Sequence, residues 1–410
     1  MQTQLAPEYR NTPEGKEAEA ILRACVHCGF CTATCPTYQV LGDELDGPRG
    51  RIYLIKQVLE GETPTRTTQT HLDRCLTCRN CESTCPSGVQ YGRLVDIGRS
   101  VVEAKVGRDP ASRAARGLIE RGLLAKPLFD TALRLGRAVR PLLPAAVKAK
   151  VLPRTDPGAW PAPRHARRVL LLDNCVQTSL APAIDAAAAR VLDRAGVSLV
   201  WIKAGGCCGA LSHHLNSHER AEAIVKANID AWWPQIEQGA EAVVGTASGC
   251  SVMLKDYGHF LRHDPTYRER AEKIAALARD LSEVVAAEWP RLRGSIRARD
   301  HDEPEAIAYH PPCTLQHGMK LRGQVEAMLA EAGFRLLPVA DSHLCCGSAG
   351  TYSILQPVIS SELKRRKLAS LEAHGPSRIA TANIGCLTHL ASGTARPVQH
   401  WIELIDERLA

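Results

Sequence analysis

The sequence lacks several features that would assign it to common protein classes. No apolar run approaches the roughly 20 residues that span a bilayer, and the polar first residues show no basic-then-apolar signal peptide. The chain contains no G-x-G and no G-K-[ST], so the glycine-rich turns that cradle dinucleotides and nucleotide phosphates are missing. We therefore expect a cytoplasmic protein with no transmembrane helix and with no flavin or NAD of its own.

Cysteine, by contrast, is abundant, with 16 among 410 residues. Cytoplasmic thiols stay reduced, so this number favours metal binding or redox chemistry over disulfides. Eight of them lie in two copies of C-x2-C-x2-C-x3-C-P, which end at Pro36 and Pro86. This motif supplies thiolates to a [4Fe–4S] cluster, and in a chain with two copies the fourth cysteine of each ligates the other cluster.

The spacing therefore predicts two [4Fe–4S] clusters, one held by Cys25, Cys28, Cys31 and Cys85 and the other by Cys75, Cys78, Cys81 and Cys35. A pair of structural zinc sites is the alternative, because zinc also takes four thiolates. Zinc sites usually show two separated C-x2-C pairs, whereas each motif here has four closely spaced cysteines.

The other eight cysteines belong to an internal repeat. One set is Cys175, Cys207, Cys208 and Cys250, and the matching set is Cys313, Cys345, Cys346 and Cys386. Matching cysteines lie 138, 138, 138 and 136 residues apart, which indicates a duplicated segment. Each half alternates short apolar strands with helices, which favours a parallel α/β layer with its cysteines at the carboxyl ends of strands. Each set is a candidate metal or cluster site. Thiol–disulfide chemistry and inert buried cysteines are the alternatives, and His310, His317 and His389 lie near enough in sequence to be further candidates.

These patterns predict an α+β protein of several domains. The predicted parts are an α-helical two-cluster ferredoxin-like domain (1–100), a basic helical connector and linker (101–166), and a duplicated α/β Cys-Cys-Gly domain (167–300 and 301–410). Inside the first part, Pro48 and Gly50 precede an apolar-periodic run from Ile52 to Leu59, which predicts a short helix.

The net charge of +7 is concentrated in one segment. From Val101 to Arg168 the chain has 15 Lys or Arg against 5 Asp or Glu, with Leu, Ile and Val at helical spacing between them. This segment is either a solvated helical hairpin or a docking face for a partner subunit or an anionic membrane surface. No recognition motif accompanies the charge, so we expect no nucleic-acid partner.

The stretches "ACVHCGFCTATCPTY" and "RCLTCRNCESTCPSG", the intervening "LGDELDGPRGRIYLIKQVLEG" and the doubled Cys-Cys-Gly domain resemble the iron–sulfur subunit of glycolate oxidase, also called glycolate dehydrogenase. The resemblance implies an electron-transfer subunit, without catalytic residues of its own, in a complex on the cytoplasmic side of the inner membrane. It implies two FAD-type flavoprotein partners, one of which oxidises glycolate to glyoxylate and sometimes D-lactate to pyruvate. It also implies a quinone-type acceptor, and all eight cysteines of the two motifs match the family's ligands.

The Cys-Cys-Gly repeats are similar to those of heterodisulfide reductase, where such cysteines hold unusual clusters. That pattern ends in C-x2-C, whereas this chain has "CSVM" at Cys250–Met253 and "CLTH" at Cys386–His389. We expect Met253 to pack in the core, and His389 is a candidate substitute ligand. Two other functions stay open: thiol–disulfide catalysis at the repeats, and service as the iron–sulfur subunit of a lactate or glycerol-3-phosphate dehydrogenase.

Overall fold

The computed structural model describes residues 1–410 except 145–147, 149–150, 154, 298–302 and 410. The chain forms two compact units. The first consists of Met1–Gly117, Gln316–Lys320 and His343–Lys367, and the second of Leu118–Leu315, Leu321–Ser342 and Leu368–Ala410. Among the described residues, every strand belongs to the second unit.

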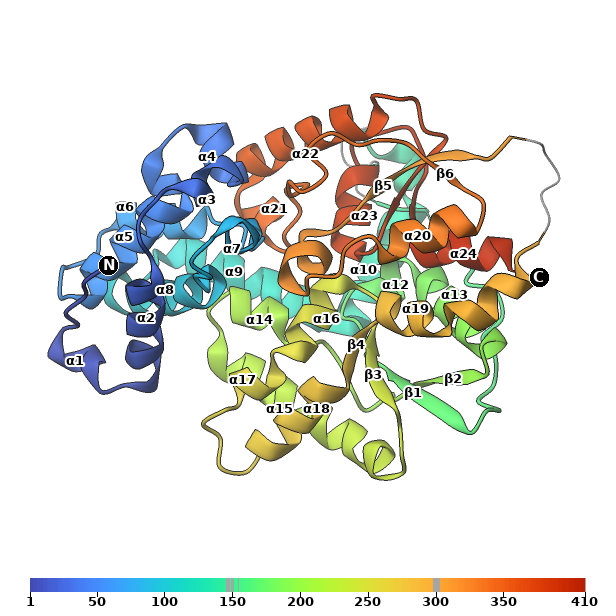
Figure 1. Cartoon of the computed structure of the whole chain (residues 1–410), viewed down its shortest axis with the longest axis horizontal. Coiled ribbons are helices and arrows are strands. Elements are labelled where there is room, and N and C mark those ends of the chain that lie inside the picture. Colours follow the sequence, from blue (N-terminus) through green and yellow to red (C-terminus); the bar gives the residue numbers. More distant parts are fainter. Residues whose placement is uncertain (145–147, 149–150, 154, 298–302, 410) are drawn as a thin grey trace. The chain divides into compact units, whose positions relative to one another are not determined.

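The N-terminal part of the first unit is a series of helices, coloured blue to cyan in Figure 1: α1 (Pro7–Arg10), α2 (Pro13–Ala24), α3 (Phe30–Ala33), α4 (Pro36–Leu41), η1 (Glu44–Asp46), α5 (Pro48–Leu59), α6 (Arg66–Asp73), α7 (Asn80–Thr84), α8 (Tyr91–Val106) and the start of α9 (Pro110–Leu124). Four of them, α1, α2, α4 and α5, have proline in the first turn, where the missing N–H costs no helical hydrogen bond. The helix predicted over 52–59 is confirmed and begins earlier, at Pro48.

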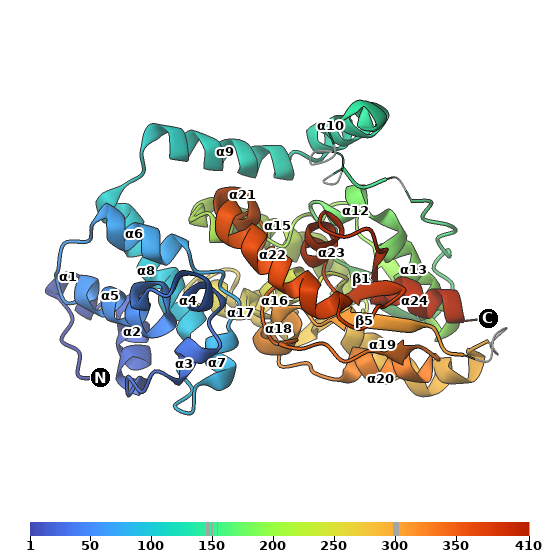
Figure 2. The same cartoon turned by 90° about the horizontal axis from the view of Figure 1, so that it is seen from above.

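The core of this unit lies between α2, α5 and α8, which are side by side in both views (Figures 1 and 2). Leu22, Ile55 and Leu94, one from each helix, are fully buried there. Gly98 allows α8 to approach α5 closely, because a Cβ at this position would lie 2.6 Å from Cγ1 of Ile55. The close packing fixes the ends of these helices, from which the cysteine loops start.

The second unit contains two four-stranded parallel sheets of corresponding topology. The first has the order β2-β1-β3-β4, with β1 (Arg167–Leu171), β2 (Val197–Trp201), β3 (Ala242–Gly245) and β4 (Ala278–Asp280). The second has the order β6-β5-β7-β8, with β5 (Ala306–His310), β6 (Arg335–Leu336), β7 (Arg378–Thr381) and β8 (Val398–His400). The same order in both halves confirms the α+β fold with a duplicated α/β domain.

Helices connect these strands in both halves. The first half has α12 (Gln177–Leu180), α13 (Pro182–Arg194), α14 (Ala210–His214), α15 (His218–Glu237), α16 (Ser248–Lys255), α17 (Tyr257–Phe260), α18 (Arg268–Leu277), α19 (Leu281–Leu292) and η3 (Arg293–Ser295). The second has η4 (Thr314–Gly318), α20 (Gln324–Glu331), α21 (Tyr352–Leu355), α22 (Pro357–Glu372), α23 (Ile384–Ala391) and α24 (Trp401–Arg408). The helix α21 and parts of η4 and α22 belong to the first unit. The domain boundaries predicted at 100, 166 and 300 stay predictions.

The basic connector is helical where it is described. It contains α9, α10 (Lys126–Ala138) and η2 (Arg140–Leu142), and Figure 2 shows α9 and α10 following each other along the chain. Within the described ranges, no helix has both the length and the apolar character needed to cross a membrane.

Candidate metal centres

The two cysteine motifs form loops with corresponding backbone conformations. Cys25 and Cys75 directly follow the ends of α2 and α6. The second and fourth residues after each of these cysteines have a positive φ: His27 (60°), Gly29 (84°), Thr77 (53°) and Arg79 (60°). A short helix, α3 or α7, then carries the third cysteine. These turns bend each loop around its own three cysteines.

Each loop lines a pocket together with cysteines from the other loop. The first pocket is lined by Cys25, Cys28 and Cys31 of its own loop and by Cys81 and Cys85 of the other. The second is lined by Cys75, Cys78 and Cys81 of its own loop and by Cys35 of the other. Cys81 and Tyr91 line both pockets, so the two spaces are neighbours. The structure thus brings together each of the two cysteine sets derived from the spacing.

Five thiols line the first pocket: Cys25, Cys28, Cys31, Cys81 and Cys85. Burial, together with the nearby thiols of Cys25, Cys85 and Cys28, raises the pKa of Cys31 to about 11. Positively charged metal would offset the repulsion between several thiolates in this space. The closely spaced thiols fit an iron–sulfur cluster.

The second pocket has cationic and hydroxyl groups beside its thiols. Burial alone would raise the pKa of Cys75, but Arg51, Arg99, the Thr77 N–H and the Tyr91 hydroxyl outweigh it and lower the pKa. The Thr77 N–H donates to Cys75 Sγ at 3.3 Å, and the Tyr91 hydroxyl at 3.6 Å. The second pocket thus favours negative charge on the sulfur of Cys75, whereas burial and the neighbouring thiols raise the pKa of Cys81 well above its usual range.

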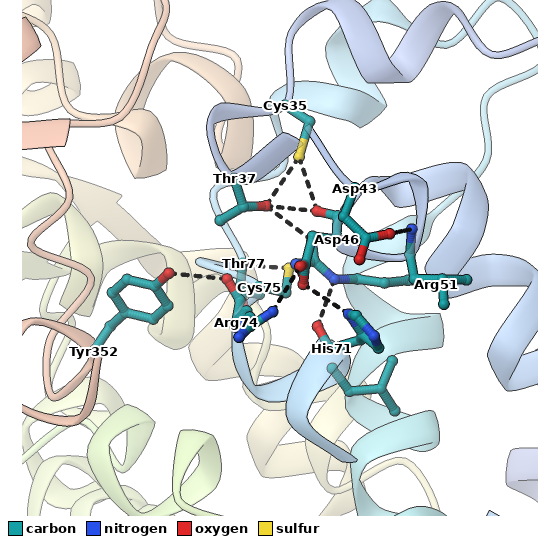
Figure 3. Close-up of polar contacts among 12 residues, drawn as sticks. Cys35, Thr37, Asp43, Asp46, Arg51, His71, Arg74, Cys75, Thr77 and Tyr352 are labelled. Atoms are coloured by element: carbon teal, nitrogen blue, oxygen red, sulfur yellow. Dashed lines mark hydrogen bonds and ion pairs between the residues drawn. The ribbon is translucent and has the colours of Figure 1, made fainter. Parts of the chain in front are cut away.

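A buried polar network continues from these contacts (Figure 3). Thr37 Oγ1 lies 3.2 Å from Cys35 Sγ and donates to the Asp46 carbonyl oxygen at 2.8 Å. Arg51 Nη1 donates to Thr37 Oγ1 at 3.1 Å, and its Nη2 lies 3.4 Å from Asp46 Oδ1. Arg74 also reaches the Asp46 carboxylate, at 2.8 Å, and His71 Nδ1 lies 3.1 Å from it.

The sequence analysis missed Arg51, although a signal for it exists. Arg51 falls on the same helical stripe as Ile55, Val58 and Leu59 and is 1% exposed. A charge on the apolar face of a short helix must find buried partners, since an unpaired buried charge is very costly. The position of Arg51 in the apolar pattern therefore could have marked it as a residue with a special environment.

The four thiols of the first repeat lie together within the second unit. Cys175 follows β1, Cys207 and Cys208 lie between β2 and α14, and Cys250 lies on α16 after β3. Hydrogen bonds link Cys175 to Cys207, Cys207 to Cys208, and Cys208 to Cys250. The cysteines therefore gather beyond the carboxyl ends of parallel strands, as expected for an open α/β sheet.

Cys207 is the acceptor at the centre of this chain of thiols. Hydrogen bonds from the thiols of Cys175 and Cys208 lower the pKa of Cys207 well below its usual range, and the Gly209 N–H donates to the same sulfur at 3.5 Å. Gly209 has a φ of 91°, which aims its N–H at that sulfur. Met253 packs in the hydrophobic core, as expected.

The second repeat shows the same local loop. The Gly347 N–H donates to Cys345 Sγ at 3.4 Å, and Gly347 has a φ of 89°. Cys345 and Cys346 belong to the first unit, whereas Cys313 and Cys386 belong to the second, so the assignment of these four cysteines to one site stays a prediction.

The candidate histidines have different environments. His317 uses both ring nitrogens within the first unit, with Nδ1 2.9 Å from Ser83 Oγ and Nε2 2.9 Å from the His343 carbonyl oxygen. His310 ends β5 and is buried, and His389 lies on α23, three residues after Cys386. His317 thus makes hydrogen bonds to two other chain segments of the first unit, and the three histidines stay candidates.

The basic connector presents apolar side chains to solvent. The exposed fraction is 75% for Leu118, 61% for Leu128 and 64% for Leu135. Arg137 donates to the carbonyl oxygens of Leu152 and Leu180, and Arg140 donates to that of Val151. These two arginines hold neighbouring chain segments, while Arg134 is exposed.

Comparisons with known proteins agree with this arrangement. The family described as "4Fe-4S dicluster domain" matches residues 21–89, and the family described as "Cysteine-rich domain" matches 169–255 and 307–391. The chain is 53% identical to the glycolate oxidase iron-sulfur subunit of Escherichia coli, over 100% of this chain and 99% of the relative. It is 30% identical to the probable glycolate oxidase iron-sulfur subunit of Bacillus subtilis, over 95% and 93% of the two chains. Lactate utilization protein A of an Exiguobacterium species is 26% identical, over 58% of this chain and 97% of its own length.

Proposed function

Because the chain belongs to the family of glycolate oxidase iron–sulfur subunits, we propose that it carries single electrons within a flavin-dependent glycolate dehydrogenase complex. Oxidation of a 2-hydroxy acid releases two electrons together, so a flavin must divide the pair before single-electron carriers accept them. We assign that step to two FAD-type flavoprotein partners, with a quinone-type compound as the final acceptor.

The observation that carries this proposal is the pair of neighbouring pockets, lined by five and four cysteines from both loops, with Cys81 common to the two. We propose that Cys25, Cys28, Cys31 and Cys85 ligate one [4Fe–4S] cluster and that Cys35, Cys75, Cys78 and Cys81 ligate the other. A cluster held there supplies reversible one-electron chemistry. The chain itself contributes the thiolates, shields four of them from water by burial (Cys25, Cys35, Cys75 and Cys81), and donates an N–H and an O–H to Cys75 Sγ.

The two Cys-Cys-Gly repeats are proposed as further metal or cluster sites. The chain of thiol hydrogen bonds from Cys175 to Cys250 supports the first site, because four sulfurs already converge there. The corresponding site in the second half is Cys313, Cys345, Cys346 and Cys386.

We further propose peripheral attachment to the cytoplasmic face of the inner membrane. The exposed leucines Leu128 and Leu135 and the exposed Arg134 on α10 support this role, because an amphipathic basic helix binds anionic lipid surfaces. Arg137 and Arg140 are occupied by carbonyl oxygens, so their neutralisation would disturb the fold as well as any attachment.

The test of the main proposal is the iron, sulfide and zinc content of anaerobically purified protein, combined with low-temperature EPR. Two clusters correspond to about eight irons per chain, with [4Fe–4S] signals on reduction. Clearly more iron, with a signal lost in Cys208→Ser or Cys346→Ser, would place clusters in the repeats as well. Zinc with little iron would refute the electron-carrier proposal.

A second candidate function is thiol–disulfide catalysis at the first repeat, favoured by the thiolate character of Cys207 between two donor thiols. In that reaction a thiolate attacks a disulfide sulfur, and the other sulfur leaves as a thiolate. Labelling of Cys207 by iodoacetamide that changes when a disulfide substrate is added would support it, and an inert Cys207 would reject it.

A further inference from the structure

Arg51 is the one residue of α5 that brings a buried positive charge to a cysteine pocket among the described residues. Its side chain is 1% exposed and lines the second pocket together with Cys35 and Cys75. Its Nε donates to the His71 carbonyl oxygen at 2.7 Å and its Nη1 to Thr37 Oγ1 at 3.1 Å. These two bonds fix the guanidinium plane beside the thiols (Figure 3).

The positive charge of Arg51 is only partly cancelled by its surroundings. Asp46 lies 3.4 Å from Arg51, but Arg74 binds the same carboxylate at 2.8 Å. Arg99 adds a third cation, which donates to the carbonyl oxygen of Cys75 at 2.6 Å. Arg51 and Arg74 therefore share the Asp46 carboxylate near the second pocket.

The first pocket has a weaker positive environment. Arg49, from the same helix, lines it, but the Nε of Arg49 is 2.7 Å from Glu44 Oε1 and both side chains are substantially exposed, 34% and 41%. Solvent and Glu44 therefore screen this charge, whereas Arg51 is shielded from water and acts through a medium of low polarity.

A hydroxyl donor adds to the difference. Tyr91 lines both pockets, but its O–H points to Cys75 Sγ of the second pocket, at 3.6 Å. Hydrogen bonds to cluster sulfurs and nearby positive charge both favour the more negative, reduced form of an iron–sulfur centre.

We propose that Arg51, assisted by Tyr91, makes the centre ligated by Cys35, Cys75, Cys78 and Cys81 the one with the higher reduction potential of the two. Arg51 is thus a positioning residue that directs where an electron resides within the first unit. This inference rests on the proposed function, since it requires iron–sulfur centres in both pockets.

The experiment is a redox titration of the full chain followed by low-temperature EPR. The wave lost in Cys28→Ser is assigned to the first-pocket centre, and the wave lost in Cys78→Ser to the second-pocket centre. At a fixed applied potential, Arg51→Met lowers the ratio of reduced to oxidised second-pocket centre roughly tenfold, equivalent to about 59 mV for one electron. Arg51→Lys restores much of this ratio because it keeps the charge, and Tyr91→Phe lowers it roughly threefold without any change in charge.

The matched control is Arg49→Met, an identical change two residues away on the same helix, which leaves the second-pocket wave where it was. If Arg51→Met does not fold, Tyr91→Phe and Arg51→Lys decide the question. Three results would overturn this inference without affecting the proposed function. They are unmoved redox waves in Tyr91→Phe, an equal shift of both waves, and a higher reduction potential of the first-pocket centre in the unaltered protein. Protein without iron–sulfur clusters would overturn the proposed function instead.

Discussion

The two cysteine loops have the same spacing and corresponding backbone conformations, but their surroundings differ. Val26 and Phe30 of the first loop are 68% and 61% exposed, and Cys28 is exposed as well. At the matching positions of the second loop, Leu76 is 7% exposed and Asn80 is 2% exposed. One ligand motif thus occurs once at the surface and once inside the unit.

The contacts of the second loop come from distant parts of the chain. Asn80 Nδ2 donates to the carbonyl oxygens of Thr34 and His343, at 3.1 and 3.2 Å, and the Tyr352 hydroxyl donates to that of Arg74 at 3.0 Å. Local sequence therefore determines how the cysteine sulfurs are arranged. Residues far along the chain determine the polarity around these sulfurs and their access to water.

The largest expected difference between the loops concerns Cys81 and Cys28. Cys81 is buried and lines both pockets, whereas Cys28 is exposed and lines one. Cys81→Ser should therefore lose nearly all iron, while Cys28→Ser should keep about four of eight irons. Iron and sulfide analysis after anaerobic purification measures both values. Equal iron loss in the two variants, or full electron transfer by Cys28→Ser in the complex, would contradict the assignment.

The second difference concerns the arginine that supports each loop. Arg99 donates to the carbonyl oxygens of Leu72 and Cys75 and to Thr77 Oγ1, at 2.6 to 3.1 Å. Arg99→Leu leaves these acceptors without their charged donor and should lower the local opening free energy by about 3 kcal/mol. Arg49→Leu breaks a half-exposed ion pair with Glu44 and should cost less than about 1 kcal/mol.

Hydrogen exchange followed by mass spectrometry over residues 66–84 and 25–41 compares these two variants, because it reports local opening in the native state. Similar protection in both variants would show that Arg99 supports its loop no better than a surface pair does.

The gathering of the eight cysteines around two pockets could be predicted, because it follows from the spacing within the two motifs; their division into two ligand sets stays a prediction. The parallel α/β repeats could be predicted too, since strands such as Val197–Trp201 and helices such as Pro182–Arg194 follow the expected patterns. The place of Arg51 on the apolar stripe of α5 could have marked it as buried, but its partners Asp46 and His71 could not be predicted, because their burial depends on how α5 and α6 pack. Neither spacing nor periodicity indicates which groups will meet a buried charge.

A third comparison tests burial directly at matching positions. Leu76→Ser removes a buried side chain and introduces a hydroxyl group, and it should destabilise the first unit by about 2 kcal/mol. Val26→Ser changes a side chain that is 68% exposed and should stay within about 0.5 kcal/mol of the unaltered protein. Bleaching of the cluster absorbance on heating measures the difference, and a lower bleaching temperature for Val26→Ser than for Leu76→Ser would refute the distinction between the loops.

The smallest expected effect lies in the left-handed turn that both loops share. Gly29 adopts φ 84° without strain, whereas Arg79 adopts φ 60° with a side chain. Gly29→Ala should cost about 1 kcal/mol, because a Cβ disfavours this conformation; it would also lie 2.4 Å from Arg49 Nη1, so that flexible side chain must move. Arg79→Gly relieves the same strain, but it raises the conformational entropy of the unfolded chain and loses the 3.4 Å contact with Glu82. Its net effect on stability should therefore be within about 0.5 kcal/mol of zero. Urea midpoints of cluster bleaching for the two variants test this, and a Gly29→Ala variant as stable as the unaltered chain would show that the first, exposed loop relaxes where the second cannot.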